Sequence, residues 1–247
     1  SGFVSSDSES SPVWIGKSHH LALKRVSASK SLTFHEHAFV FNIQRECHDL
    51  LLEDGAGYGP GRKTIQVAPD AYNVTIRRFF SLWEKLDVSE NQWCTNVDFY
   101  GGHDNTYENL VAYQNGLSNS CNGAPGHSAL IAGTNQRILG SVSFKPGGNS
   151  FYFTGCSYCL MKDVVSLDGG ANTGIYANIS RFSSPIQGNQ VRNYTWVNGQ
   201  PGAYGVRLML SETTDSLDVR HSYFQGADSA YAIARADGVL GNLIHSD

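Results

Sequence analysis

The chain has 247 residues, of which only 16% are charged, and its formal net charge is -4. This length suffices for one large domain with a substantial core, while so mild a charge excludes nucleic acid as an expected partner. No apolar run approaches the roughly 20 residues that span a bilayer, so no membrane span is expected.

One frame recurs along the chain: a short apolar strand, a polar turn, an apolar-x-apolar triplet and two charged or polar residues. The triplets begin, in chain order, at Leu21, Leu50, Val74, Thr106, Ile138, Cys159, Val191, Leu217 and Val239. The gaps between these positions are unequal, but in most copies the preceding strand ends at a nearly constant distance from the triplet. A fixed corner with loops of variable length predicts a solenoid of strands.

Other all-β architectures fit the pattern less well. A sandwich would show mirror-related strands joined by hairpin turns, and a propeller would need a longer period with several strands per blade. Amphipathic periodicity of the helical kind is confined to a short ambiguous piece, LWEKLDVSEN. The pattern therefore favours a parallel β-helix of about nine coils that forms a single domain over residues 1–247.

Three segments carry a family resemblance: AYNVTIRRFF, SLDVRHSYF and HHLALKRVSA. They resemble the coils of right-handed parallel β-helix proteins of the pectate-lyase-like superfamily. The resemblance implies a right-handed parallel β-helix and no particular activity, because this fold hosts lyases, hydrolases, phage tailspikes, adhesins and surface-layer proteins. The catalytic motifs of pectate lyases and polygalacturonases are absent, so no catalytic residue is carried over from the family.

Stacked coils place equivalent residues about 4.8 Å apart, so the charges that follow the triplets form a column. In the first four coils these charges alternate in sign: Lys24-Arg25, Glu53-Asp54, Arg77-Arg78 and, if register is kept, Glu108-Asn109. One interpretation is a salt-bridge ladder that holds the fold together, each pair contributing about 0 to 1 kcal/mol.

The same column is also the predicted catalytic site, with Glu53, Asp54, Arg77, Arg78 and Glu108 as the candidate residues. Glu53 and Glu108 would lie about 9.6 Å apart, at the edge of the range for inverting glycosidases. A lyase would instead use an arginine to neutralise a uronate carboxylate, and Lys24 or a histidine as the base.

Aromatic residues gather beside this column, in two coils and the insert between them. Flat rings suit the faces of pyranoses, so Lys24, Trp83, Trp93 and Tyr107 are the predicted substrate-binding residues. The alternative is that the segment with the tryptophans only covers the side of the helix.

The cysteines and histidines predict no metal centre. Cys94 and Cys121 could close one segment in an oxidising compartment, and Cys156 and Cys159 are expected to be two small buried thiols rather than a redox motif. The pair His35 and His37, with His20 and His48 nearby, lacks the spacing of known metal motifs, and cofactors cannot be assigned.

The function expected from these features is an extracellular protein that interacts with an extended polysaccharide. The leading interpretation is a lyase or glycoside hydrolase on an acidic polysaccharide, and the alternative is a non-catalytic adhesin, tailspike-like or cell-surface polysaccharide-binding module. Because the ends of a β-helix expose unpaired backbone, we also expect a longer parent protein, or neighbouring chains that cover the ends.

Overall fold

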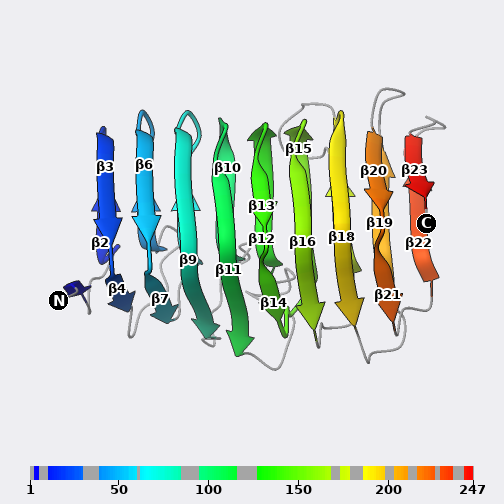
Figure 1. The fold of residues 1–247 in the computed structure, drawn as a ribbon, viewed down its shortest axis with the longest axis horizontal. Coiled ribbons are helices and arrows are strands. Elements are labelled where there is room, and N and C mark those ends of the chain that lie inside the picture. The colour runs from blue at the N-terminus through cyan, green and yellow to red at the C-terminus, as the bar shows by residue number, and fades with distance from the viewer. Residues whose placement is uncertain are drawn as a thin grey trace.

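The computed structural model describes residues 3–5, 11–29, 39–59, 62–84, 95–115, 127–167, 173–178, 186–197, 203–210, 216–225, 229–235 and 242–246. Every strand pairing among these residues is parallel, and the chain winds through three sheets in turn before it begins the next coil. Figure 1 shows the coils following one another along the long axis, in the right-handed sense. The predicted right-handed parallel β-helix is thereby confirmed.

The three sheets share one axis and are joined by two corners and a set of longer connections. The first sheet contains β2 (Val13–Ile15), β5 (Phe39–Ile43), β8 (Lys63–Val67), β10 (Thr95–His103), β12 (His127–Thr134), β15 (Asn149–Ser157), β17 (Thr173–Asn178), β19 (Tyr204–Leu210) and β22 (Ser229–Arg235). The second contains β3 (His19–Lys24), β6 (His48–Glu53), β13 (Arg137–Leu139), β20 (Ser216–Arg220), β23 (Asn242–Ser246) and the first halves of β9 (Tyr72–Glu84), β11 (Thr106–Asn115), β16 (Leu160–Leu167) and β18 (Asn189–Val197). The third contains the second halves of those four strands with β1 (Phe3–Ser5), β4 (Val26–Ser29), β7 (Ala56–Gly59), β14 (Val142–Phe144) and β21 (Tyr223–Gln225).

The core is a set of stacked columns between the three sheets. In the second sheet the third positions of seven successive triplets, from the second triplet on, form an unbroken buried column: Leu52, Ile76, Tyr107, Ile138, Met161, Val191 and Val219. The alternation of inward and outward residues that the triplets predicted is therefore present. The predicted number of about nine coils stays a prediction, because parts of the chain lie outside the described residues.

The predicted start of the fourth triplet is wrong by one residue. Thr106 pairs with Thr75, an outward position, so Thr106 and Glu108 face away from the core. The inward residues of this coil are Asn105 and Tyr107, both fully buried. This register removes the break in the core column that the sequence pattern suggested.

Two further triplet starts are displaced for the same reason. Ile138 pairs with Tyr107 and Val191 pairs with Met161, so both occupy the third position of their triplets. In each of these coils a buried amide fills the first position, and the apolar pattern therefore begins later. The remaining start, Val239, lies outside the described residues.

Buried amides satisfy backbone groups in the corner between the first and second sheets. Asn105, Gln136 and Asn189 are at most 1% exposed. Asn105 accepts a hydrogen bond from the N–H of Val74 at 2.9 Å and donates one to the carbonyl of Ala71 at 3.1 Å. Each such amide thus ties a corner to the neighbouring coil and leaves fewer polar backbone groups unpaired.

Two columns of residues with left-handed backbone mark the corners on either side of the second sheet. The first column, the turn ridge, has φ between 52° and 58° and consists of His20, Asp49, Asn73, Asp104, Asn135 and Tyr158. The second has φ between 49° and 56° and contains Arg25, Asp54, Arg78, Asn109, Asp163, Asn193 and His221. Short polar residues tolerate this conformation better than branched ones, which explains much of the composition of both columns.

The described cysteines differ from expectation. Cys156 and Cys159 form a disulfide rather than two separate thiols, and Cys47 is buried and free. The predicted pairing of Cys94 with Cys121 lies outside the described residues.

Candidate functional site

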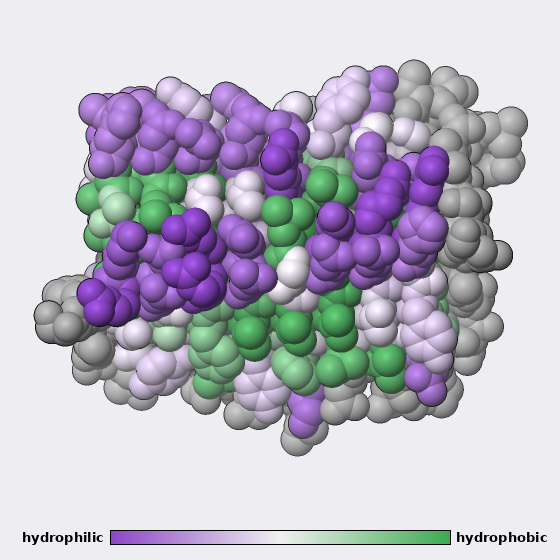
Figure 2. Space-filling view, viewed as in Figure 1, coloured by the Kyte–Doolittle hydropathy of each residue, from purple (hydrophilic) through white to green (hydrophobic). Residues whose placement is uncertain are grey.

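The predicted charge ladder is present on the outer side of the second sheet. Lys24 pairs in register with Glu53, Glu53 with Arg77, and Arg77 with Glu108, as the repeat predicted. In Figure 2 the outer surface shows two hydrophilic bands along the long axis with a more hydrophobic strip between them. Strand β6 has the same order of polar, apolar and polar residues, because the apolar Leu51 lies between the acidic Asp49 and Glu53.

Glu53 is the centre of this ladder and is only 4% exposed. Its Oε2 lies 2.9 Å from Lys24 Nζ, and its Oε1 accepts hydrogen bonds at 2.6 Å from Arg77 Nε and at 2.5 Å from Arg78 Nη2. Arg78 also donates to Asp54, from Nε to Oδ1 at 2.6 Å. These contacts join residues of three successive coils, those of β3, β6 and β9, through the oxygens of the two carboxylates.

These contacts keep the ladder charged. The hydrogen bond from Lys24, with those from Arg77 and Arg78, outweighs burial and lowers the pKa of Glu53 to about 2. The hydrogen bonds that Arg78 donates to Asp54 and Glu53 raise the pKa of Arg78, and the bond to Asp54 in turn lowers the pKa of Asp54. A carboxylate with these partners does not supply a proton near neutral pH, so the arrangement is that of a structural clamp.

The aromatic candidates lie elsewhere than predicted. The ring of Tyr107 is fully buried and stacks on Phe99 with centroids 4.1 Å apart, and Trp83 is 6% exposed. A ring in the core cannot lie against a sugar at the surface, so neither residue is in a position to bind substrate. Trp93 lies outside the described residues. Glu108, half-buried, is the remaining predicted acid and lies beside Arg77.

A surface feature that the sequence did not reveal is a stack of four rings, one coil apart, directly before the turn ridge. The ring stack consists of His19, His48, Tyr72 and His103, with successive centroid separations of 5.1, 4.8 and 4.9 Å and nearly parallel planes. Residue type varies along the stack, so no repeated letter marks it. Each ring residue directly precedes a residue of the turn ridge. An alignment of the sequence repeats with the correct register in the fourth coil would therefore have revealed the stack.

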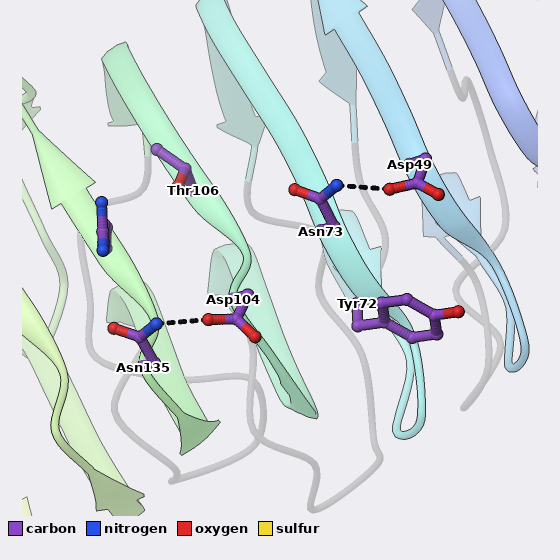
Figure 3. Close-up of a pocket in the computed structure, with 7 residues that line it drawn as sticks. Asp49, Tyr72, Asn73, Asp104, Thr106 and Asn135 are labelled. Atoms are coloured by element: carbon purple, nitrogen blue, oxygen red, sulfur yellow. Dashed lines mark hydrogen bonds between the residues drawn. The ribbon is translucent and has the colours of Figure 1, made fainter.

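Next to the ring stack the turn ridge borders an open pocket of about 480 Å³, the ridge pocket. It is lined by Asp49, Tyr72, Asn73, Asp104, Thr106, Asn135 and Arg137. Figure 3 shows Asn73 directed at Asp49 and Asn135 directed at Asp104, and both amides donate hydrogen bonds to these carboxylates. Thr106 and Arg137 come from the adjacent outward column of the second sheet.

Neighbouring imidazoles hold the two ridge carboxylates. His48 Nδ1 lies 2.9 Å from Asp49 Oδ2, and His103 Nδ1 lies 2.7 Å from Asp104 Oδ2. The hydrogen bond from His48 lowers the pKa of Asp49, and the one from His103 lowers the pKa of Asp104. Both carboxylates are therefore ionised hydrogen-bond acceptors near neutral pH, and neither has the raised pKa of a general acid.

The described part of the chain offers no cluster of three or more histidine, cysteine or acidic residues that could hold a metal ion. His35 and His37, which the sequence placed near a possible cluster, lie outside it. No helix long and apolar enough to cross a bilayer occurs among the described residues.

Comparison of the sequence with family models and with curated proteins gives no match. Among solved structures the chain is similar to the catalytic unit of a thermostable GH87 alpha-1,3-glucanase from Streptomyces thermodiastaticus, with a TM-score of 0.57 and 13% identity over 96% of this chain and 49% of that one. The chain thus spans about half the length of the glucanase unit. The likeness confirms the fold class.

Two further structures are similar at lower TM-scores. An alginate lyase from Paenibacillus sp. gives 0.38 with 14% identity over 91% of this chain and 76% of that one. PfbA, a surface adhesin of Streptococcus pneumoniae, gives 0.41 with 11% identity over 92% and 72%.

Proposed function

We propose that this chain is an extracellular polysaccharide-binding β-helix that holds an extended sugar chain at the ridge pocket. The observation that carries the proposal is the lining of that pocket, in which carboxylate, amide, hydroxyl and guanidinium groups lie on successive coils. Sugars bind through pairs of hydroxyls to fixed acceptors and donors of these kinds, and the coil repeat of about 4.8 Å offers a new set for each step along the ligand.

Binding accounts for the geometry better than hydrolysis does. Asp49 and Asp104 are two coils apart, about 9.6 Å by the coil repeat, which lies at the edge of the separation used by inverting glycosidases. Hydrolysis of that kind needs one of the two acids protonated near neutral pH. The imidazole and amide partners lower both pKa values, so this pair lacks the acid.

The charge ladder has a secondary part in this proposal. Lys24 and Arg77 keep about half and a third of their side chains exposed beside the hydrophobic strip. They offer cations to a ligand that carries carboxylates, while their main contacts remain with Glu53. The preferred ligand is therefore an acidic polysaccharide whose carboxylates face these cations and Arg137 and whose hydroxyls face the ionised Asp49 and Asp104.

The test is affinity gel electrophoresis with a panel of neutral and uronate polysaccharides, with unsaturated ends and reducing sugar followed in parallel. We expect retardation by an acidic polysaccharide without either product. Arg137→Ala should weaken the retention about tenfold, because a charge-assisted hydrogen bond is lost.

Lys145→Ala is the matched control, since it removes an exposed cation that follows β14 in the third sheet. Its retention should equal that of the unaltered chain. Absence of retention by every polysaccharide would contradict the proposal. Release of product that Arg137→Ala abolishes would show instead that the pocket is catalytic.

A further inference from the structure

A second pocket, of about 380 Å³, lies on the outer side of the first sheet and its corner. This corner pocket is lined by Phe39, Asn42, Gln44, Arg45, Arg62, Gln66, Ala68, Pro69 and Tyr100. The predicted site residues include none of these. Its volume is in the range of small-molecule sites, at the size of a single sugar unit.

The charges of the corner pocket differ from those of the ridge pocket. Its described lining contains two guanidinium groups, Arg45 and Arg62, three side-chain amides and no carboxylate. Arg45 is exposed, whereas Arg62 is only 8% exposed. A lining of this composition favours an anionic ligand, because guanidinium groups bind carboxylates with two parallel hydrogen bonds.

Asn42 narrows the choice of ligand. Its side chain is 6% exposed, and its Oδ1 has no hydrogen-bond partner among the described residues. A buried acceptor without a donor is destabilising, so a ligand that brings a donor would satisfy it. Sulfate offers only acceptors, whereas a sugar offers hydroxyl groups.

The floor of the corner pocket is held rigidly. Lys63, 1% exposed, forms an ion pair with Asp98, donates a hydrogen bond to Gln66 Oε1 at 3.0 Å and places its ammonium 4.2 Å from the centre of the Tyr100 ring. These contacts fix two lining side chains, Gln66 and Tyr100. An aromatic ring beside fixed amides is a surface on which a pyranose can lie.

We infer that the corner pocket binds a sugar acid, a single hexuronate unit whose carboxylate meets Arg45 and Arg62 and whose hydroxyl donates to Asn42 Oδ1. The unit combines the anion that the guanidinium groups require with the donor that Asn42 requires. Tyr100, which is half-buried, supplies apolar contact for the ring of the sugar.

This inference stands apart from the ridge pocket. The chain passes from Gln44 and Arg45 through His48 of the ring stack to Asp49, and from Pro69 through Tyr72 to Asn73. In both coils the ring-stack residue thus separates the corner-pocket residues from the ridge-pocket residues in sequence. A single acidic polymer that occupied both pockets would have to pass over the ring stack. A hexuronate monomer tests the corner pocket alone.

The experiment is ligand-observed NMR, with saturation transfer and titration, using a hexuronate, the neutral hexose of the same configuration and inorganic sulfate. We expect the hexuronate to bind more tightly than the hexose, and sulfate to displace it only weakly. Arg45→Gln and Asn42→Leu should each lower hexuronate affinity about tenfold. Lys145→Gln, the control, should bind as the unaltered chain does.

Asn42 is buried, so thermal unfolding checks that its variant folds, and the exposed Arg45 gives a test that does not depend on a core substitution. Absence of hexuronate binding to the unaltered chain would overturn the inference, as would unchanged affinity in Arg45→Gln. If sulfate bound as tightly as the hexuronate, the pocket would be a general anion site and the inference of a sugar-acid site would be wrong. If polysaccharide retention persists while hexuronate binding is absent, only the corner pocket fails and the proposed function stands.

Discussion

Asn105 shows how a single residue decides the register of a coil. Its side chain occupies a core position that Leu50 and Val74 fill in the preceding coils, and it is fully buried. The sequence marks Asn105 as a polar turn residue, and a pattern based on apolar alternation therefore starts this coil one residue late. Only the hydrogen bonds to the neighbouring coil reveal that a buried amide can replace an apolar side chain there.

Replacement of Asn105 by alanine should lower the free energy of unfolding by about 1 to 3 kcal/mol, because the N–H of Val74 and the carbonyl of Ala71 lose their partner. Urea denaturation of the two proteins measures the difference. Thr75→Ala, an outward and half-buried position of the neighbouring coil, is the control and should lose clearly less. If both variants lost the same free energy of unfolding, the side-chain hydrogen bonds of Asn105 would contribute nothing to stability.

At the scale of elements, the charge ladder could be predicted and the pockets could not. The ladder depends only on which residues stack, and the repeat supplied that for Lys24, Glu53 and Arg77. The ridge pocket also depends on how a corner presents its side chains, and it includes Arg137 from an outward column that the displaced alignment hid. The corner pocket gathers residues from β5, β8 and β10 and from the segments next to β5 and β8, which no periodic pattern connects.

Because the ladder lowers the pKa of Glu53 to about 2 from its ordinary 4.5, its contribution to stability depends on pH. The ionised form is favoured in the folded chain, so the stabilisation is fully present above about 4.5 and is lost as the pH falls toward about 2. Glu53→Gln should lower the melting temperature at neutral pH, and the difference from the unaltered chain should shrink across that acidic window.

Melting curves recorded at a series of pH values measure this difference. Glu46→Gln is the control, since the contact of Glu46 with Lys17 is exposed and should contribute little. Should Glu53→Gln leave the melting temperature unchanged but abolish polysaccharide retention, the ladder would be part of the binding site rather than a clamp.

At the scale of the whole molecule, each coil contacts mainly the coils before and after it. The repeat frame was sufficient to predict this arrangement, because a strand, a corner and a triplet recur with fixed internal spacing. Stability should then be close to a sum of coil contributions and contacts between neighbours. The free energy of unfolding that a substitution removes should therefore depend on the position of the residue along the helix axis as well as on its burial.

Ile76 and Leu23 test this directly, since they are equivalent positions of different coils. Ile76 is fully buried and lies between Leu52 and Tyr107, so Ile76→Ala should lower the free energy of unfolding by about 2 to 5 kcal/mol. Leu23 is only partly buried, in a strand that pairs with β6 alone among the described strands, so Leu23→Ala should lose markedly less. Urea denaturation gives both values, and hydrogen exchange should show weaker protection in β3 than in β9. Losses of equal size would contradict a dependence of stability on contacts between neighbouring coils.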